Sequence, residues 1–114
     1  MPLPKLIHRQ ADVILSEFCQ IQVPFALRDE IRLSHQFRGN SVTLIEQRPA
    51  PDSPDKWLDI KVARFDYDLD TGLWSLLWRD RNVRWHLYPR IEPSKDFHQL
   101  LLEVEADPIG IFWG

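Results

Sequence analysis

Cysteine is almost absent from this chain of 114 residues, in which Cys19 is the only one. One cysteine cannot form an internal disulfide, so the sequence excludes a disulfide-stabilised scaffold and favours a reducing compartment. Long apolar runs are also lacking, because nowhere do about 18 apolar residues follow one another, as a membrane-spanning helix requires. The first ten residues, MPLPKLIHRQ, contain no apolar stretch of the signal-peptide kind. We therefore expect a cytoplasmic protein without a membrane partner.

Linkers, repeats and a strong net charge are missing too. The proline-rich break RPAPDSPDKW is too short to separate two domains, and no repeat or glycine-serine linker occurs. The 14 basic residues stand against 17 acidic ones, a net charge of −3. This balance argues against a protein that coats nucleic acid through bulk electrostatics, but it allows a local basic patch. With five Trp and six Phe available for a core, residues 1–114 are predicted to form one domain.

Helical periodicity marks both ends of the chain. Apolar residues recur at steps of three and four over about residues 5–22, and a helix there would end before Pro24. A second amphipathic helix is predicted over about residues 95–106, after start signals at Pro93 and Ser94. The expected buried positions are Ile7, Ala11, Ile14, Phe18 and Ile21 in the first helix and Phe97, Leu100, Leu101 and Val104 in the second.

The region between the helices alternates as strands do. Strands are predicted over about residues 30–38, 41–48, 57–67, 73–80 and 83–88. The apolar residues of this region change from even to odd positions near Val62-Ala63, which indicates a β-bulge. The predicted fold class is α+β, with one antiparallel sheet of about five strands flanked by an N-terminal and a C-terminal helix, both on its aromatic face.

Two hairpin registers follow from the rule that a one-residue slip exchanges the two faces of a strand. The tight turn Gly39-Asn40 connects the first hairpin, and a four-residue loop that ends at Gly72 connects the second. The expected pairs are Arg38–Ser41, Phe37–Val42 and His35–Leu44 in the first hairpin and Tyr67–Trp74, Phe65–Leu76 and Ala63–Trp78 in the second.

The segment WRDRNVRWH, residues 78–86, is predicted to form the last hairpin. A two-residue turn at Arg81-Asn82 pairs Trp78 with Trp85 and Leu76 with Leu87, which assigns the tryptophans to the core. The same register places Arg79 directly across from Arg84 on the opposite face. Like charges in that position destabilise a sheet. A local conflict of this kind points to a functional surface.

An arginine-rich sheet face is therefore the leading candidate site. Guanidinium groups donate two parallel hydrogen bonds to phosphate oxygens, and helix-flanked antiparallel sheets recur among nucleic-acid-binding proteins. The candidate ligand-binding residues are Arg79, Arg81, Arg84, Arg64, Arg32, Arg38, His86 and Tyr88. The alternative is an ordinary solvated face, and pairing of every arginine with a carboxylate would favour it. The leading hypothesis is a non-catalytic module that binds an anionic partner, nucleic acid first, without a cofactor.

The apolar ending IGIFWG supports a hypothesis from another class. Its residues Ile111, Phe112, Trp113 and Gly114 either dock on their own domain or, together with an edge strand, contact a second copy or another protein. Sequence leaves this choice open.

Metal binding and catalysis have weaker support. The four histidines, His8, His35, His86 and His98, are scattered without the spacing of a zinc site, so no metal is expected. A small hydrolase or transferase using His86 is the third hypothesis. The predicted register sets His86 opposite Leu77 and far from Asp80, and no nucleophile elbow, phosphate loop or HExxH motif occurs.

Three segments resemble a known family. RGNSVTLIEQRP, TGLWSLLWRDRNVRWHLY and the ending DPIGIFWG are similar to a family of small bacterial proteins, domain of unknown function three thousand and twenty-four. The likeness runs from about Phe18 to Gly114, and the ending is its most specific part. It implies a bacterial, cytoplasmic protein of one domain. The family brings no activity, cofactor or catalytic residue to transfer.

Overall fold

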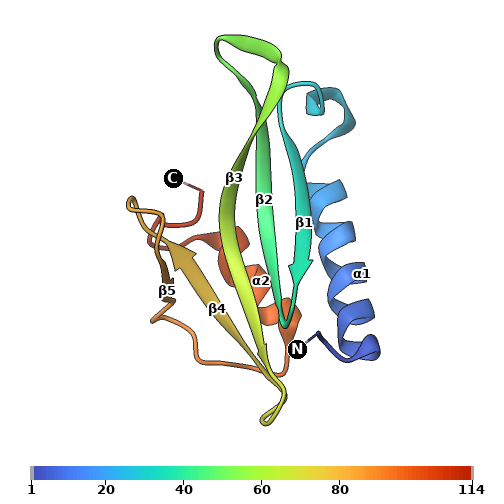
Figure 1. The fold of residues 1–114 in the computed structure, drawn as a ribbon, viewed down its shortest axis with the longest axis vertical. Coiled ribbons are helices and arrows are strands. Elements are labelled where there is room, and N and C mark those ends of the chain that lie inside the picture. Colours follow the sequence, from blue (N-terminus) through green and yellow to red (C-terminus); the bar gives the residue numbers. More distant parts are fainter. Residues whose placement is uncertain (1, 114) are drawn as a thin grey trace.

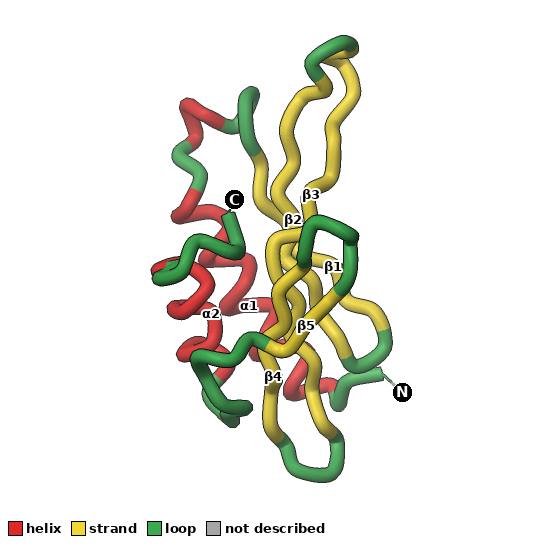
Figure 2. The backbone as a smooth tube through the Cα atoms, turned by 90° about the vertical axis from the view of Figure 1, so that its left-hand side faces the viewer, coloured by secondary structure: helices red, strands yellow, loops and turns green. Residues whose placement is uncertain are grey.

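The computed structural model describes residues 2–113. Its elements are α1 (Lys5–Gln22), the short 3-10 helix η1 (Phe25–Leu27), β1 (Arg32–Arg38), β2 (Ser41–Ala50), β3 (Ser53–Asp68), β4 (Leu73–Arg79), β5 (Trp85–Leu87) and α2 (Phe97–Ala106). The strands form one antiparallel sheet in the order β1-β2-β3-β4-β5, which confirms the α+β class. In Figure 1 α2 lies behind the sheet and α1 runs beside β1, and Figure 2 shows both helices on one side of the sheet. We call the opposite side of the sheet the outer face.

The helices use nearly the faces that their sequences indicate. All four apolar positions expected in α2 are buried, and Asp96 caps this helix by accepting a hydrogen bond from the Gln99 N–H. The buried stripe of α1 runs through Ala11, Leu15 and Phe18. Ile21 was expected on this stripe but is 76% exposed, because the buried part of the stripe ends at Phe18, before the last turn of the helix. None of the helices within residues 2–113 is long and apolar enough to cross a membrane.

The first two hairpins have the predicted registers. Phe37 pairs with Val42 and Phe65 with Leu76, and the other expected pairs form as well except Ala63–Trp78. That pair is missing because the ladder between β3 and β4 ends at Arg64 and Leu77, beyond which the two strands diverge. Gly72 has the expected left-handed conformation, with φ of +71°.

A β-bulge lies at Val62, as the shift of the apolar residues from even to odd positions predicts. Leu44 pairs with Ala63 and the next residue, Ile45, pairs with Lys61, so Val62 is the additional residue on β3. Both Val62 and Ala63 are buried as a result. The bulge keeps β3 in contact with the core while the strand bends, and it sets the side to which Lys61 points.

The β2–β3 hairpin is longer than the sequence pattern indicates. β3 begins at Ser53, not near residue 57, and the proline-rich segment pairs through Pro49 with Trp57 and Ala50 with Ser53. A second register shift accommodates the prolines there. The hairpin projects past the helices, as Figure 1 shows.

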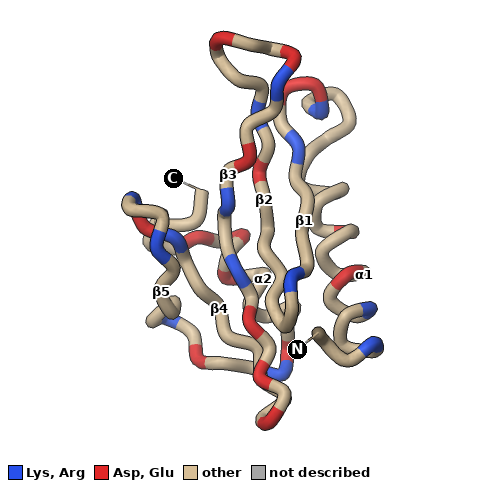
Figure 3. Tube along the Cα trace, viewed as in Figure 1, with Lys and Arg blue, Asp and Glu red and all other residues tan. Residues whose placement is uncertain are grey.

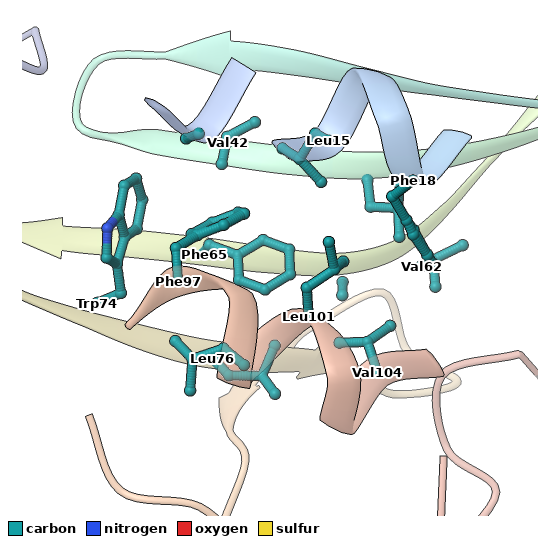
Figure 4. Close-up of a cluster of buried hydrophobic side chains, with 14 of the residues drawn as sticks. Leu15, Phe18, Val42, Val62, Phe65, Trp74, Leu76, Phe97, Leu101 and Val104 are labelled. Carbon is teal, nitrogen blue, oxygen red and sulfur yellow. The ribbon is translucent and has the colours of Figure 1, made fainter. Parts of the chain in front are cut away.

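The core lies between the sheet and the two helices. Figure 4 shows Leu15 and Phe18 of α1, Phe97 and Leu101 of α2, and sheet residues such as Phe65 directed toward one another. The ring of Phe97 lies 4.7 Å from that of Phe65 and 4.9 Å from that of Trp74, between ring centroids. Burial of each such side chain stabilises the fold by roughly 1.5–3 kcal/mol.

The last hairpin corrects a prediction by one residue. Trp78 pairs with His86, Arg79 with Trp85 and Leu77 with Leu87, so the expected Trp78–Trp85, Leu76–Leu87 and Arg79–Arg84 pairs do not form. The Asp80 N–H donates to the Arg84 carbonyl oxygen, which closes a three-residue loop in place of a two-residue turn. Such a loop needs a left-handed residue, and Val83 supplies it with φ of 67°. A β-branched residue rarely adopts this conformation, which is why sequence reasoning missed the loop.

This register exchanges the faces of β5. Trp85 lies on the outer face and is not a core residue, whereas His86 and Tyr88 face the helix side. Tyr88, expected on the opposite face, is 3% exposed and donates a hydrogen bond of 2.9 Å to the Glu103 carboxylate. Burial, with Glu103 second, raises the pKa of Tyr88 above its ordinary value.

Candidate nucleic-acid interface

The outer face carries a polar depression of about 340 Å³, which we call the basin. It is lined by Gln36 and Arg38 of β1, Ser41 and Thr43 of β2, Lys61 and Arg64 of β3, and Trp85 of β5. These residues belong to four strands, so only the folded sheet brings them together. Figure 3 shows Lys and Arg on β1, on β3 and around the β4–β5 hairpin, with acidic residues between them.

Strand register explains why the side chains of the basin share one face. Gln36 pairs with Thr43, and Thr43 pairs in turn with Arg64, so the three lie in one row across the sheet. The next row contains Arg38, Ser41 and Asp66. Because side chains alternate along a strand, every second residue of β1 and β2 points to the outer face, and Gln36, Arg38, Ser41 and Thr43 are those that line the basin.

Arg64 is held in place by its neighbours. Its Nε and Nη2 donate to the two carboxylate oxygens of Asp66 at 2.9 and 3.0 Å, and Ser41 Oγ donates to Asp66 at 2.7 Å. The guanidinium carbon lies 5.2 Å from the centre of the Trp85 ring, within the range of a cation–π contact. The Nη1 group remains outside the ion pair, so Arg64 keeps donors for another acceptor.

Most cations of this surface have no carboxylate partner within residues 2–113. The ion pairs of those residues are His35–Asp12, Arg48–Glu46, Arg64–Asp66 and His86–Asp80. Arg38, Lys61 and Arg79 belong to none of them. Pairing of every arginine with a carboxylate would have favoured an ordinary solvated face. The described residues do not show such complete pairing.

The predicted ligand-binding residues separate into four groups. Arg38 and Arg64 lie in the basin, whereas Arg32 lies farther along the outer face, with its guanidinium carbon 3.8 Å from the centre of the Trp57 ring. Arg79 is the cross-strand neighbour of Trp85, and the β4–β5 loop carries the two other candidate arginines. These are Arg81 and Arg84. His86 and Tyr88 are separated from the basin because they face the helix side.

Sequence reasoning missed Trp85 and Lys61 as members of the site. The outward position of Trp85 follows from the three-residue loop before it, and Asp80 is the residue that favours this loop. Its carboxylate accepts hydrogen bonds from the N–H groups of Asn82 and Arg84 at 2.8 and 3.0 Å. An aspartate at the start of a loop commonly accepts such bonds, and this favours the longer connection. The position of Lys61 on the outer face follows from the β-bulge at Val62, which shifts the alternation of β3 by one residue.

Asp80 and His86 form a pair that the predicted register had set far apart. His86 Nε2 lies 2.6 Å from Asp80 Oδ2, and the imidazole stacks on Trp78 with ring centroids 4.9 Å apart. The hydrogen bond with His86, followed by that from the Arg84 N–H, lowers the pKa of Asp80. This carboxylate holds the loop together. Among residues 2–113, no three His, Cys, Asp or Glu side chains gather as a metal site would require.

The apolar tail packs on its own domain as far as Trp113. The Asp107 carboxylate accepts hydrogen bonds from the N–H groups of Ile111, Phe112 and Trp113, and the Trp113 indole donates to the Val104 carbonyl at 2.8 Å. Phe112 is 5% exposed and its ring lies 5.1 Å from that of Tyr88. Gly114, the last of the expected interaction residues, lies outside the described residues.

Fold and surface together define a small α+β domain with a cationic and aromatic sheet face. The chain belongs to the family described as Domain of unknown function (DUF3024), whose sequence model matches residues 3–114. The match confirms the resemblance of the three segments. No curated protein and no solved structure matches the chain.

Proposed function

We propose that this protein binds single-stranded nucleic acid on the outer face of its sheet, with the basin at the centre of the site. The observation that carries the proposal is the position of Trp85, a partly exposed indole bordered by Arg64 and by the basin cations Arg38 and Lys61. A stacking surface among cations is the arrangement that single strands require.

The chemistry of the basin divides between bases and backbone. Trp85 offers a π-face to a base, and such stacking contributes about 1–3 kcal/mol per base with little sequence preference. The guanidinium of Arg38 and the ammonium of Lys61 suit phosphate oxygens, while Ser41 and Thr43 provide hydroxyl donors. A duplex keeps its bases stacked inside, so it cannot use Trp85 in this way, and the proposal favours single strands.

Charge distribution is consistent with a local site. The net charge of −3 makes the rest of the surface repel a polyanion, so binding rests on a few contacts in the basin. Affinity should fall with salt, because each neutralised phosphate releases a counterion, and the slope should match the few phosphates contacted. A cytoplasmic location is part of the same proposal, since the lone Cys19 suits a reducing compartment.

The test is a titration of fluorescent single- and double-stranded RNA and DNA, followed by anisotropy at about 50 and about 200 mM salt. Trp85→Ala and the double variant Arg38→Glu, Lys61→Glu should each weaken single-strand binding at least about tenfold. Arg9→Glu is the matched control, because Arg9 is exposed on α1. Absence of binding at the lower salt, or equal binding by Trp85→Ala and the unaltered protein, would exclude the proposal.

A second candidate function is contact with a second copy or another protein. It is favoured by Leu87 of the edge strand β5, which is 67% exposed, and by Ile109 of the tail, which is 46% exposed. Apolar groups on an unpaired strand edge commonly mark association. Sedimentation at several concentrations tests this candidate. A mass that stays monomeric, or a dimer that persists in Leu87→Lys, would contradict it.

A further inference from the structure

A second depression, of about 550 Å³, lies where β4 diverges from β3, and we call it the tail groove. The β3 strand borders one side, the end of β4 with its loop borders the other, and the C-terminal tail borders it as well. Figure 1 shows the C-terminal segment beside the β4–β5 hairpin, behind the gap between β3 and β4. Lys61 lines both the basin and the tail groove, so the two depressions adjoin.

The lining of the tail groove is both aromatic and cationic. Trp113, with Ile60 and Val83, provides an apolar surface, and Lys61, Arg79 and Arg81 provide three positive charges. Two carboxylates also line it: Glu46 is ion-paired with Arg48, which lines the groove too, and Asp80 accepts a hydrogen bond from His86 but keeps its negative charge, so four cations stand against two carboxylates. Within residues 2–113, the other three cations have no ion-pair partner. The uncompensated charge of the groove is therefore positive.

We infer that the tail groove binds a nucleotide through its phosphate and its base. A phosphate monoester carries close to two negative charges and several acceptor oxygens. It therefore binds to two or three neighbouring cations more strongly than a carboxylate does. An indole beside those cations suits a planar ring. The volume also lies in the range of small-molecule sites, about 300–1,000 Å³.

Trp113 is positioned as a rigid surface rather than a loose end. Its indole N–H donates to the Val104 carbonyl, and its backbone N–H donates to Asp107 at 3.2 Å. A preorganised aromatic group loses little conformational freedom when a ligand stacks on it. Opposite the tail, Val83 holds a left-handed conformation that its β-branched side chain disfavours. Strain of this kind gathers at ligand sites.

The tail groove has its own aromatic group, Trp113, so binding of a free nucleotide there is independent of the proposed function, whereas binding of a strand end rests on it. Two sources supply the same chemistry: a free mononucleotide, or the phosphorylated end of a strand that crosses from the basin past Lys61. A free nucleotide needs the groove alone, whereas a strand end would also depend on the basin. These dependences distinguish the two sources.

Isothermal titration calorimetry with adenosine 5′-monophosphate, adenosine and inorganic phosphate provides the first test. Adenosine 5′-monophosphate should bind at least about tenfold more tightly than either part, because phosphate and base are recognised together. Arg79→Gln and Arg81→Gln should each weaken its binding about tenfold, as expected for loss of a charged hydrogen-bond donor. Arg9→Gln, the same neutralisation on α1, should bind as the unaltered protein does.

A second arm uses short oligonucleotides with a 5′-phosphate, a 3′-phosphate or no terminal phosphate. Preference for one phosphorylated end, lost in Arg79→Gln and in Trp85→Ala, would support the groove with a strand end as its ligand. Mononucleotide binding lost only in Arg79→Gln and Arg81→Gln would support it with a free nucleotide. The inference is overturned if neither ligand class binds in a manner that depends on Arg79 or Arg81. Oligonucleotide binding that depends on Trp85 alone would overturn it and leave the proposed function intact.

Discussion

The Arg64 guanidinium lies against the ring of Trp85 while two of its nitrogens bond the carboxylate of Asp66. The ion pair thus orients the cation beside the one aromatic side chain of the basin. It also neutralises part of the positive charge that a polyanion would meet. Asp66 therefore has two opposing effects, one on geometry and one on electrostatics, and they can be separated experimentally.

Asp66→Asn should strengthen single-strand binding. The amide still accepts a hydrogen bond from Arg64, while the charge of the basin rises by one, on the scale of one added phosphate contact. We expect an increase in affinity of about threefold to tenfold at about 50 mM salt, and a smaller one at about 200 mM. Anisotropy titrations measure it, with Glu105→Gln on the exposed surface of α2 as the control. Weaker binding by Asp66→Asn would mean that orientation of Arg64 outweighs charge.

Val83→Asn should stabilise the fold. Val83 has φ of 67° and is 60% exposed, so it has conformational strain and little burial to lose. Asparagine adopts the left-handed conformation more readily, and we expect the free energy of unfolding to rise by about 1 kcal/mol. Urea denaturation measures this as a higher midpoint with an unchanged slope. The matched control is Val13→Asn, because Val13 is 52% exposed on α1 and should show no gain. An unchanged midpoint in Val83→Asn would contradict the expected strain.

Two substitutions at Asp107 should weaken the tail in a defined order. Asp107→Asn keeps one oxygen for the N–H groups of Ile111 and Phe112 but removes the acceptor of the Trp113 N–H, whereas Asp107→Ala removes all three contacts. Since a hydrogen bond to a charged group contributes about 1.5–3 kcal/mol, the alanine variant should lose at least about 2 kcal/mol and the asparagine variant less. Chemical denaturation gives these values. Hydrogen exchange at Trp113 should accelerate in both variants, and equal stability of the two would contradict the assignment.

Tyr88 should make stability fall at alkaline pH. Its pKa is raised in the folded state, chiefly by burial, so the fold favours the neutral phenol. That contribution is complete below the ordinary pKa of 10.0 and is lost as pH rises through the higher folded value. In Tyr88→Phe the unfolding free energy should be lower by about 1 kcal/mol at neutral pH, for the lost bond to Glu103, and should decline less between pH 9 and 11. An identical alkaline decline in both proteins would exclude Tyr88 as the cause.

The two end helices and the first two hairpins were predictable because local signals agree there. In α2 every apolar position expected to be buried is buried, since its period matches a single face. Phe37 meets Val42 because a turn of two residues and strict alternation allow one register only. Local chemistry was sufficient in both cases.

The last hairpin was not predictable in the same way, because β5 is three residues long and its neighbourhood offers large side chains on both faces. Trp85 and Leu87 could fill core positions as well as Tyr88 does, so alternation could not choose between the two faces. Contacts distant in sequence accompany the observed choice: Tyr88 meets Glu103 of α2 and Phe112 of the tail. With Tyr88 buried, Trp85 must point outward.

The sequence by itself determined the α+β class, the two amphipathic helices, the bulge near Val62 and an arginine-rich sheet, because each follows from periodicity or from turn residues close in the chain. The tertiary structure decided which side chains share a surface. Trp85 joins Arg38, Lys61 and Arg64 only when four strands are in register. Trp113 and Arg79 line the same groove only when Asp107 holds the tail against its own domain. Such sites depend on packing between segments far apart in the chain, which local patterns do not encode.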